Sequence, residues 1–327
     1  MNESSNPAFL TPSSQIPMTF GQILDRIYRL MRSNLKLFIG IAAVPAGALI
    51  PIMAVVFAVA FVPIIVQQQR HSDPGAALGF IAPAILVVMV LNLAVFALYL
   101  AASVHAASQA HLGLKITFSE AYGVAWKQFG RYLWLLFLTY IIAFAPLLVA
   151  ELVFIVPTML FSMNKAAPPE AFFFIIFLGV LLFIAAMIYG TIVALRLSLA
   201  FPASLAEGLP AWAAIRRSNQ LTQGAKGRVF LVLLVIYAFA YAAEMVVFVV
   251  LAVIFGVGAL LMAVLHLQPD SLPAIIGIGG ALVCLIGIFF LWMALIWSAF
   301  STSFAVLYYD QRLRKEGSTP APVGEPA

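Results

Sequence analysis

Residues 207–230 read Glu-Gly-Leu-Pro-Ala-Trp-Ala-Ala-Ile-Arg-Arg-Ser-Asn-Gln-Leu-Thr-Gln-Gly-Ala-Lys-Gly-Arg-Val-Phe and form the longest hydrophilic stretch between the apolar runs of this chain. They combine a short basic helix with the first residues of a long apolar one. The same combination begins at Thr19 and again at Thr117. The sequence therefore predicts three repeats of one unit, with boundaries near 18–113, 114–206 and 207–316.

The composition identifies the class of protein. The 327 residues are 64% hydrophobic and only 9% charged, with a mean hydropathy of +1.09. Globular chains are about half apolar and about a quarter charged, so this composition indicates a polytopic membrane protein. The apolar runs exceed the roughly 20 residues of a membrane-spanning helix and lack the alternation of barrel strands. We therefore expect an all-α fold with six spans, at about 37–66, 78–110, 132–163, 172–205, 229–267 and 272–309, between disordered tails at 1–17 and 317–327.

A short amphipathic helix is expected at the start of each unit. The first two begin with capping-box sequences, Thr19-x-x-Gln22 and Thr117-x-x-Glu120. Apolar residues then recur at helical spacing, with basic residues on the other face. This pattern is typical of a helix at the membrane surface, whose apolar side chains enter the lipid while its cations stay in water.

The third unit is less regular than the other two. Pro210 is expected in the first helical turn, and Gly224 and Gly227 are expected to break the helix before the fifth span. Residues 223–228, Gln-Gly-Ala-Lys-Gly-Arg, could cradle a phosphate with backbone amides and cations. A flexible basic turn also accounts for them, and we favour that interpretation.

The second half of the second span carries small residues at helical spacing. Such residues let two helix backbones approach closely, so we expect this face to pack against protein and not against lipid. The residues are Ala97, Ala101, Ala102, Ser103, Ala106, Ala107 and Ala110.

The distribution of basic residues predicts the orientation. Four lie before the first span, three between the second and third, four between the fourth and fifth, and three after the sixth; the links on the other side hold only Arg70 and Lys165. By the positive-inside rule, both termini are cytoplasmic in a multi-pass protein of the cytoplasmic (inner) membrane. Units of the same orientation are related by an axis along the membrane normal, so we expect a pseudo-threefold bundle.

Three segments resemble one known family. They are Phe20–Arg26 (Phe-Gly-Gln-Ile-Leu-Asp-Arg), Ile215–Gly224 (Ile-Arg-Arg-Ser-Asn-Gln-Leu-Thr-Gln-Gly) and Leu307–Gly317 (Leu-Tyr-Tyr-Asp-Gln-Arg-Leu-Arg-Lys-Glu-Gly). They are similar to patterns of the glycerophosphoryl diester phosphodiesterase membrane-domain family, although Gln22 replaces its usual acidic residue. The soluble phosphodiesterase barrel that accompanies some members needs about 250 residues, and no polar stretch here is that long. The resemblance therefore implies the membrane part alone, without the hydrolase.

Motifs of known membrane enzymes are absent from the sequence, including His-Glu-x-x-His, Gly-x-Ser-x-Gly and the Walker phosphate loop. The four histidines, His71, His105, His111 and His266, lie in different segments without metal-ligand spacing. We therefore expect no catalytic residues, no metal, no cofactor and no nucleic-acid partner.

Two classes of function fit these features. We favour a non-enzymatic membrane module that contacts anionic lipid, or a membrane-protein partner, through its basic cytoplasmic helices. The alternative is a transporter of a small solute or a lipid, with a carrier-like bundle; a polar cavity at midplane would favour it, whereas an alanine-packed centre would favour the module. The residues expected to contact headgroups or the partner are Arg26, Arg29, Arg32, Lys127, Arg131, Arg216, Arg217, Lys226, Arg228, Arg312 and Arg314, with Tyr308 and Tyr309 as interfacial anchors.

Three formal charges lie within the predicted spans: Glu151, Arg196 and Glu244. Ionisable residues inside a membrane are costly and are candidates for function. Arg196 is close enough to the cytoplasmic end of its span to reach the interface. Both glutamates lie deeper, in corresponding parts of two units, so we expect them to face the bundle interior or an outward-open cavity.

Overall fold

The computed structural model describes residues 17–48, 51, 74–163, 169–264 and 272–317. Over these residues the chain is all-helical, as predicted. The predicted tails, apart from Pro17 and Gly317, lie outside the described residues. The helices are α1 (Phe20–Ser33), α3 (Pro74–His111), α4 (Phe118–Lys127), α5 (Phe129–Met163), α6 (Pro169–Leu197), α7 (Ala200–Glu207), α8 (Ala211–Thr222), α9 (Lys226–Val264) and α10 (Leu272–Glu316), with a shorter apolar helix, Leu35–Ala48, after α1.

Several of these helices are suited to a membrane. Five stretches are long and apolar enough to cross one, and they correspond to the second to sixth predicted spans. Of the first predicted span, Leu35–Ala48 is helical and most of the rest lies outside the described residues. The five stretches are Ile85–His111, Phe129–Met159, Phe172–Glu207, Lys226–Gly258 and Gly287–Glu316.

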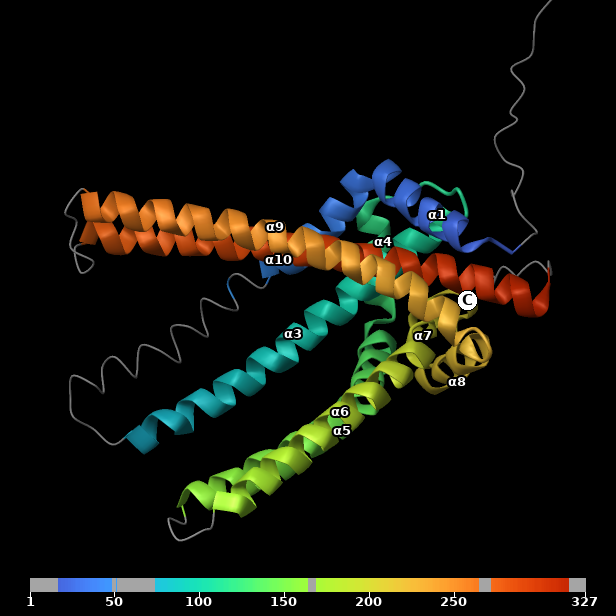
Figure 1. The fold of residues 1–327 in the computed structure, drawn as a ribbon. Coiled ribbons are helices and arrows are strands. Elements are labelled where there is room, and N and C mark those ends of the chain that lie inside the picture. The colour runs from blue at the N-terminus through green and yellow to red at the C-terminus, as the bar shows by residue number, and fades with distance from the viewer. Residues whose placement is uncertain (1–16, 49–50, 52–73, 164–168, 265–271, 318–327) are drawn as a thin grey trace, which may run out of the picture.

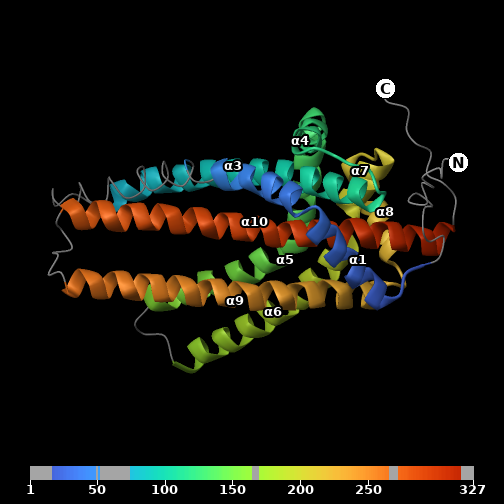
Figure 2. The same cartoon turned by 90° about the horizontal axis from the view of Figure 1, so that it is seen from above.

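The long helices share one packed end and diverge from it. Figure 1 shows α3, the α5–α6 pair and the α9–α10 pair running outward in different directions, while the short helices α1, α4, α7 and α8 gather where the long ones meet. Figure 2 shows the same arrangement from above, with α3 beside α10. α5 packs on α6 and α3 packs on α10. Away from the packed end large apolar side chains are exposed, such as Phe173 on α6 and Phe239 on α9, as expected for helices that face lipid.

Alanine packing at the shared end confirms one prediction from the sequence. All seven small residues of the predicted face, from Ala97 to Ala110, are buried in α3. The Tyr99 hydroxyl lies on the same side of α3, donates to the Ala294 carbonyl and forms a 2.9 Å hydrogen bond with Ser298 Oγ of α10. Because small side chains allow close approach, α3 and α10 come together along this face.

The prediction that the apolar stripes of the surface helices enter lipid is wrong for α1. Its side chains Ile23, Ile27 and Leu30 are buried in a core cluster that includes Val306 and Leu307 of α10. The stripe is therefore covered by protein. Neighbouring helices remove these side chains from water as the membrane would, so the stripe gains the same hydrophobic stabilisation without entering lipid.

The predicted fourth span is not one continuous helix. α6 ends at Leu197 and α7 begins at Ala200. Ser218 of α8 compensates for the break, because its hydroxyl donates to the Arg196 carbonyl (2.6 Å) and accepts from the Leu199 N–H (3.1 Å).

The start of the third unit also differs from the prediction. Pro210 is the N-cap of α8 and not its first helical residue, and no side-chain hydrogen bond caps that end. Gly224 has φ of +80°, a conformation that favours glycine, and it lies in the middle of the connection between α8 and α9. Gly227 does not break the helix, because α9 begins at Lys226 and includes it.

Both predicted capping boxes are present and are confirmed. The side chain of Thr19 accepts from the Gln22 N–H, and that of Thr117 accepts from the Glu120 N–H. Glu120 returns a carboxylate oxygen to the Thr117 N–H at 2.8 Å, whereas Gln22 returns a neutral amide oxygen to the Thr19 N–H at 2.7 Å. The two helices therefore begin with the same geometry and a different charge.

This difference predicts a pH effect at α4 only. The hydrogen bond from the Thr117 backbone lowers the pKa of Glu120 below its ordinary value of 4.5. A carboxylate with a depressed folded-state pKa stabilises the fold above that ordinary value and ceases to do so as the pH falls through the folded-state pKa. Amide protection factors in the first turn of α4 should therefore fall as the pH drops below the ordinary Glu value of 4.5, whereas those of α1 should not. Hydrogen exchange read by mass spectrometry measures both, and equal losses in the two helices would contradict the assignment.

Candidate functional site

A belt of charged side chains joins the helices at their shared end. We call it the polar belt and define it by its residues. It connects the segment before α1 with α7, α8, the start of α9 and the end of α10. Its members are Met18 (through its backbone), Glu207, Arg217, Arg228, Tyr308, Asp310, Gln311, Arg312, Arg314 and Glu316.

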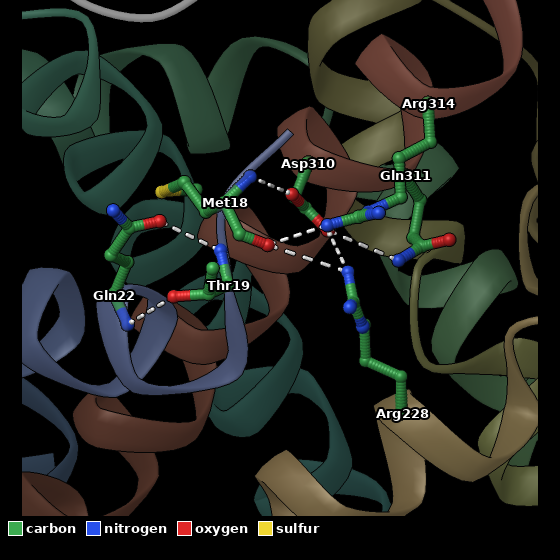
Figure 3. Close-up of polar contacts among 7 residues, drawn as sticks. All are labelled: Met18, Thr19, Gln22, Arg228, Asp310, Gln311 and Arg314. Carbon is green, nitrogen blue, oxygen red and sulfur yellow. Dashed lines mark hydrogen bonds and ion pairs between the residues drawn. The ribbon is translucent and has the colours of Figure 1, made fainter. Parts of the chain in front are cut away.

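Asp310 is the most buried charge of the belt, with 1% of the residue exposed. Its Oδ1 accepts from the Met18 N–H at 2.9 Å, and its Oδ2 accepts from Arg314 Nε at 2.8 Å and Gln311 Nε2 at 3.2 Å. Arg228 Nη1 of α9 lies 3.6 Å from the same Oδ2 (Figure 3). A buried carboxylate needs such partners to offset its desolvation, so Asp310 holds α9, α10 and the segment before α1 together.

The start of α1 is attached to the belt through its backbone. The Met18 carbonyl accepts from Arg228 Nη1 at 3.4 Å and from Arg314 Nη2. Thr19 and Gln22 of the capping box follow directly, as Figure 3 shows. The position at which α1 begins is therefore fixed both by its own cap and by Asp310.

A second group of contacts centres on Glu207 at the end of α7. Both of its carboxylate oxygens accept from Arg217 Nε of α8, at 2.9 and 3.0 Å, and Oε1 also accepts from the Tyr308 hydroxyl at 2.6 Å. Arg217 reaches Glu316 with its Nη2, and Arg312 Nε reaches the same carboxylate at 3.1 Å. The last turns of α10 are thereby joined to α7 and α8.

Other cations bind the carbonyls at helix C-termini. Arg26 Nη2 donates to the His111 carbonyl at the end of α3 (2.8 Å). Arg131 donates to the Ser204 and Gly208 carbonyls at the end of α7 (3.3 and 3.0 Å). Lys315 Nζ donates to the Gln223 carbonyl after α8 (2.9 Å). Such contacts satisfy carbonyls without an intrahelical partner and complement the helix dipole.

The structure thus divides the cations predicted to contact lipid into two groups. The inward group, Arg26, Arg131, Arg217, Arg228, Arg312 and Arg314, contacts carbonyls or carboxylates of the protein. The outward group is exposed on the surface helices and consists of Arg29, Arg32, Lys127 and Arg216, with Lys226 half-buried at the start of α9. Arg29 pairs with Asp25 on its own helix.

Each surface helix exposes an aromatic ring next to a cation of the outward group. The rings are Tyr28, Trp126 and Trp212, which are 60%, 68% and 52% exposed. Arg29 follows Tyr28 and Lys127 follows Trp126 in the chain, and the Arg216 guanidinium lies 5.6 Å from the centre of the Trp212 ring. We call these three sets the aromatic–cation pairs. The direct succession of aromatic and basic residue in two of them is the sequence signal that could have revealed them.

The expected role of Tyr308 as an interfacial anchor is wrong. Tyr308 is fully buried and donates to Glu207, and Tyr309 stacks on His111 with ring centres 5.1 Å apart. The hydroxyl that Tyr308 would present to headgroups is bonded to Glu207, and the ring of Tyr309 is covered by His111 at the end of α3. Sequence reasoning also missed Asp310 and Glu207, because outside the spans it considered only cations. The spacing of four between Asp310 and Arg314 was the available signal.

The three charges within the spans are not brought together. Glu151 is exposed on α5, Arg196 is exposed near the end of α6, and Glu244 is half-buried on α9. That both glutamates face the interior of the bundle stays a prediction. Among the described residues, no three His, Cys, Asp or Glu side chains form a group that could hold a metal ion.

A recess of about 290 Å³ lies beside Asp310, at the start of α9. Its lining comes from the connection between α8 and α9, the first turn of α9 and the end of α10. The lining residues are Gly224, Ala225, Gly227, Arg228, Gln311 and Arg314.

Comparison of the chain with models of known protein families, with curated proteins and with solved structures finds no match in any of the three. The resemblance to the glycerophosphoryl diester phosphodiesterase membrane-domain family, which rests on three short segments, therefore stays a prediction.

Proposed function

We propose that the chain is a non-enzymatic membrane module whose packed end docks on the anionic cytoplasmic leaflet through the aromatic–cation pairs. The single observation that carries this proposal is their recurrence: α1, α4 and α8 each expose one large aromatic ring beside a cation. Tryptophan and tyrosine rings favour the headgroup region of a bilayer, and each nearby Lys or Arg contributes about 1 kcal/mol of attraction to an anionic leaflet. The recurrence on three helices gives three attachment points.

The proposal includes the predicted topology. In this topology the chain crosses the cytoplasmic (inner) membrane six times, and both termini and the three surface helices lie on its cytoplasmic side. The contacts support a cyclic arrangement of three units. The surface helix of each unit packs on the last long helix of another unit: α4 on α3, and α8 on α6. α1 packs on α10, the last helix of the third unit, and so closes the ring.

The alanine packing of α3 supports a module over the alternative, a transporter. A substrate path that opened through the packed end would need polar, water-accessible surface there, whereas the C-terminal half of α3 buries small residues against α10 and α5. The same exposed pairs could instead recognise an acidic surface of a membrane-protein partner, and the experiment below separates the two.

The test compares the amounts of anionic lipid that the purified wild type and its variants retain. A variant in which Gln replaces Lys127 and Arg216 of the pairs, and Arg32, the exposed cation one turn after Tyr28, loses three attractions of about 1 kcal/mol each. Retention of anionic over neutral lipid should therefore fall by at least about tenfold. Trp126→Ala with Trp212→Ala should also lower it, whereas Phe239→Ala, which removes an even more exposed ring on a predicted lipid-facing span, should not. Mass spectrometry of co-purified lipid measures the retention. Unchanged retention in both variants would reject lipid docking and leave the partner protein as the ligand of the surface.

A further inference from the structure

The recess beside Asp310 has an unusual combination of charges. Arg228 and Arg314 line it, and their guanidinium groups converge on Asp310 from α9 and α10 (Figure 3). The Asp310 side chain itself is completely buried and is not part of the lining. The carboxylate therefore lies behind the two arginines and fixes their orientation, while the surface of the recess presents the cations.

Both guanidinium groups retain hydrogen-bonding capacity. A guanidinium carries five N–H donors. The contacts with Asp310 and Met18 use Nη1 of Arg228 and Nε and Nη2 of Arg314. The other N–H groups of both side chains are not engaged by these contacts. Two more cations are close in the chain, since Lys226 begins α9 and Lys315 follows Arg314, so the surroundings stay positive after Asp310 is counted.

The backbone of the recess is open as well. The first amides of α9 have no partner within the helix, because the first four N–H groups of any α-helix lack one. Glycine stands at two positions of the lining, and a Cβ built on Gly227 or on Gly224 would meet nothing within 4 Å. A ligand could therefore approach the backbone at Gly227 without meeting a side chain.

We infer that this recess binds a phosphate group. Planar guanidinium groups hold phosphate oxygens with paired, charge-assisted hydrogen bonds, and Asp310 orients two of them in advance. Amides at the start of α9 add donors on the same side. This inference replaces the simple basic turn that the sequence favoured for residues 223–228. The recess lies where two apolar helices, α9 and α10, reach the packed end; the phosphate is therefore that of a phospholipid headgroup if the proposed docking is correct, and that of a soluble phosphate ester if it is not.

Gly227→Ala tests the inference without endangering the fold. Alanine is favoured over glycine inside a helix by about 0.5–1 kcal/mol, and its methyl group meets no protein atom within 4 Å, so the variant should be at least as stable as the wild type. The methyl group would occupy the recess in front of the amides. Gly123→Ala in α4, which is also helical and open, is the matched control.

The first measurement is calorimetric titration of inorganic phosphate into the full chain in phosphatidylcholine nanodiscs. The wild type and Gly123→Ala should bind, and Gly227→Ala should bind at least about tenfold more weakly, the loss expected for one or two hydrogen bonds to a charged group. Binding of equal strength in Gly227→Ala, or no binding by the wild type, would overturn the inference.

The second measurement identifies the source of the phosphate. In nanodiscs that also contain phosphatidic acid, a headgroup in the recess would compete with inorganic phosphate and weaken its apparent affinity; unchanged affinity would assign the site to a soluble phosphate. The Gln variant of Arg32, Lys127 and Arg216 makes the two proposals separable. If the Gln variant keeps both its anionic-lipid retention and its phosphate binding, lipid docking is rejected and the phosphate site is retained. If Gly227→Ala binds phosphate normally while the Gln variant loses lipid, the phosphate site is rejected and lipid docking is retained.

Discussion

Replacing Asp310 by alanine is expected to lower the free energy of unfolding by about 2–3 kcal/mol. The substitution leaves Arg228 and Arg314 facing each other without their common carboxylate and leaves the Met18 N–H without its acceptor. Removal of one partner of a buried pair costs about 3–5 kcal/mol. We expect less here, because the two arginine side chains are 32% and 29% exposed and can turn toward water.

Two further variants make this prediction specific. Asp310→Asn keeps an oxygen that can accept from Met18 but removes the negative charge, so it should destabilise the protein less than Asp310→Ala while still releasing the arginines. Asp25→Ala removes the carboxylate of an exposed pair with Arg29 and should leave the stability nearly unchanged, because water screens such a pair. Thermal unfolding in a mild detergent, followed by tryptophan fluorescence, ranks the three. An Asp310→Ala protein as stable as Asp25→Ala would mean that the polar belt does not hold the helices together.

The sequence predicted those parts of the fold that depend on neighbours in the chain. The capping boxes at Thr19 and Thr117 involve residues three apart, and both helices begin where they were expected. The long apolar helices followed from hydropathy alone, because a bilayer requires about 20 apolar residues of any helix that crosses it. The buried face from Ala97 to Ala110 followed from the small residues that close helix packing needs.

Features that depend on distant partners could not be predicted in this way. The break between α6 and α7 is stabilised by Ser218, which lies 19 positions after Leu199. Met18 and Asp310 are 292 positions apart, so neither residue indicates the other. The inward cations were assigned to lipid because the positive-inside rule counts Lys and Arg without regard to what they contact, and Arg131 or Arg314 satisfies that count while binding protein.

The candidate site was predicted only in its position along the chain. Residues 223–228 were recognised as a basic, glycine-containing turn, but the two features that make the recess suited to an anion come from elsewhere. Arg314 and Gln311 belong to α10, and the carboxylate that orients the arginines is buried behind them. The outward cations behave differently: their exposure on α1, α4 and α8 follows from the helical periodicity that placed them opposite the apolar stripe. The polar belt therefore connects the helices internally, while the aromatic–cation pairs remain available outside.

Enlarging the alanine face of α3 should have the second large effect. Ala102 is completely buried in the core cluster and lies three residues after Tyr99, on the same side of the helix. Ala102→Leu adds a branched side chain where the backbones of packed helices are close, and such overpacking costs about 1–3 kcal/mol. Displacement of α3 from α10 should also weaken the hydrogen bond between the Tyr99 hydroxyl and Ser298. We therefore expect a lower unfolding temperature than in the wild type.

Ala238→Leu is the matched control, because Ala238 is exposed on α9 and the same three carbon atoms are added there without meeting a neighbouring helix. It should leave the unfolding temperature unchanged. The pair of variants also bears on function. If the α3–α10 interface is a dry, fixed contact, Ala102→Leu should destabilise the protein equally in neutral and in anionic lipid. A destabilisation that disappears in one lipid would mean that α3 and α10 separate there, since only an interface that opens can accommodate the larger side chain. Such an outcome would contradict the static module and favour the transporter.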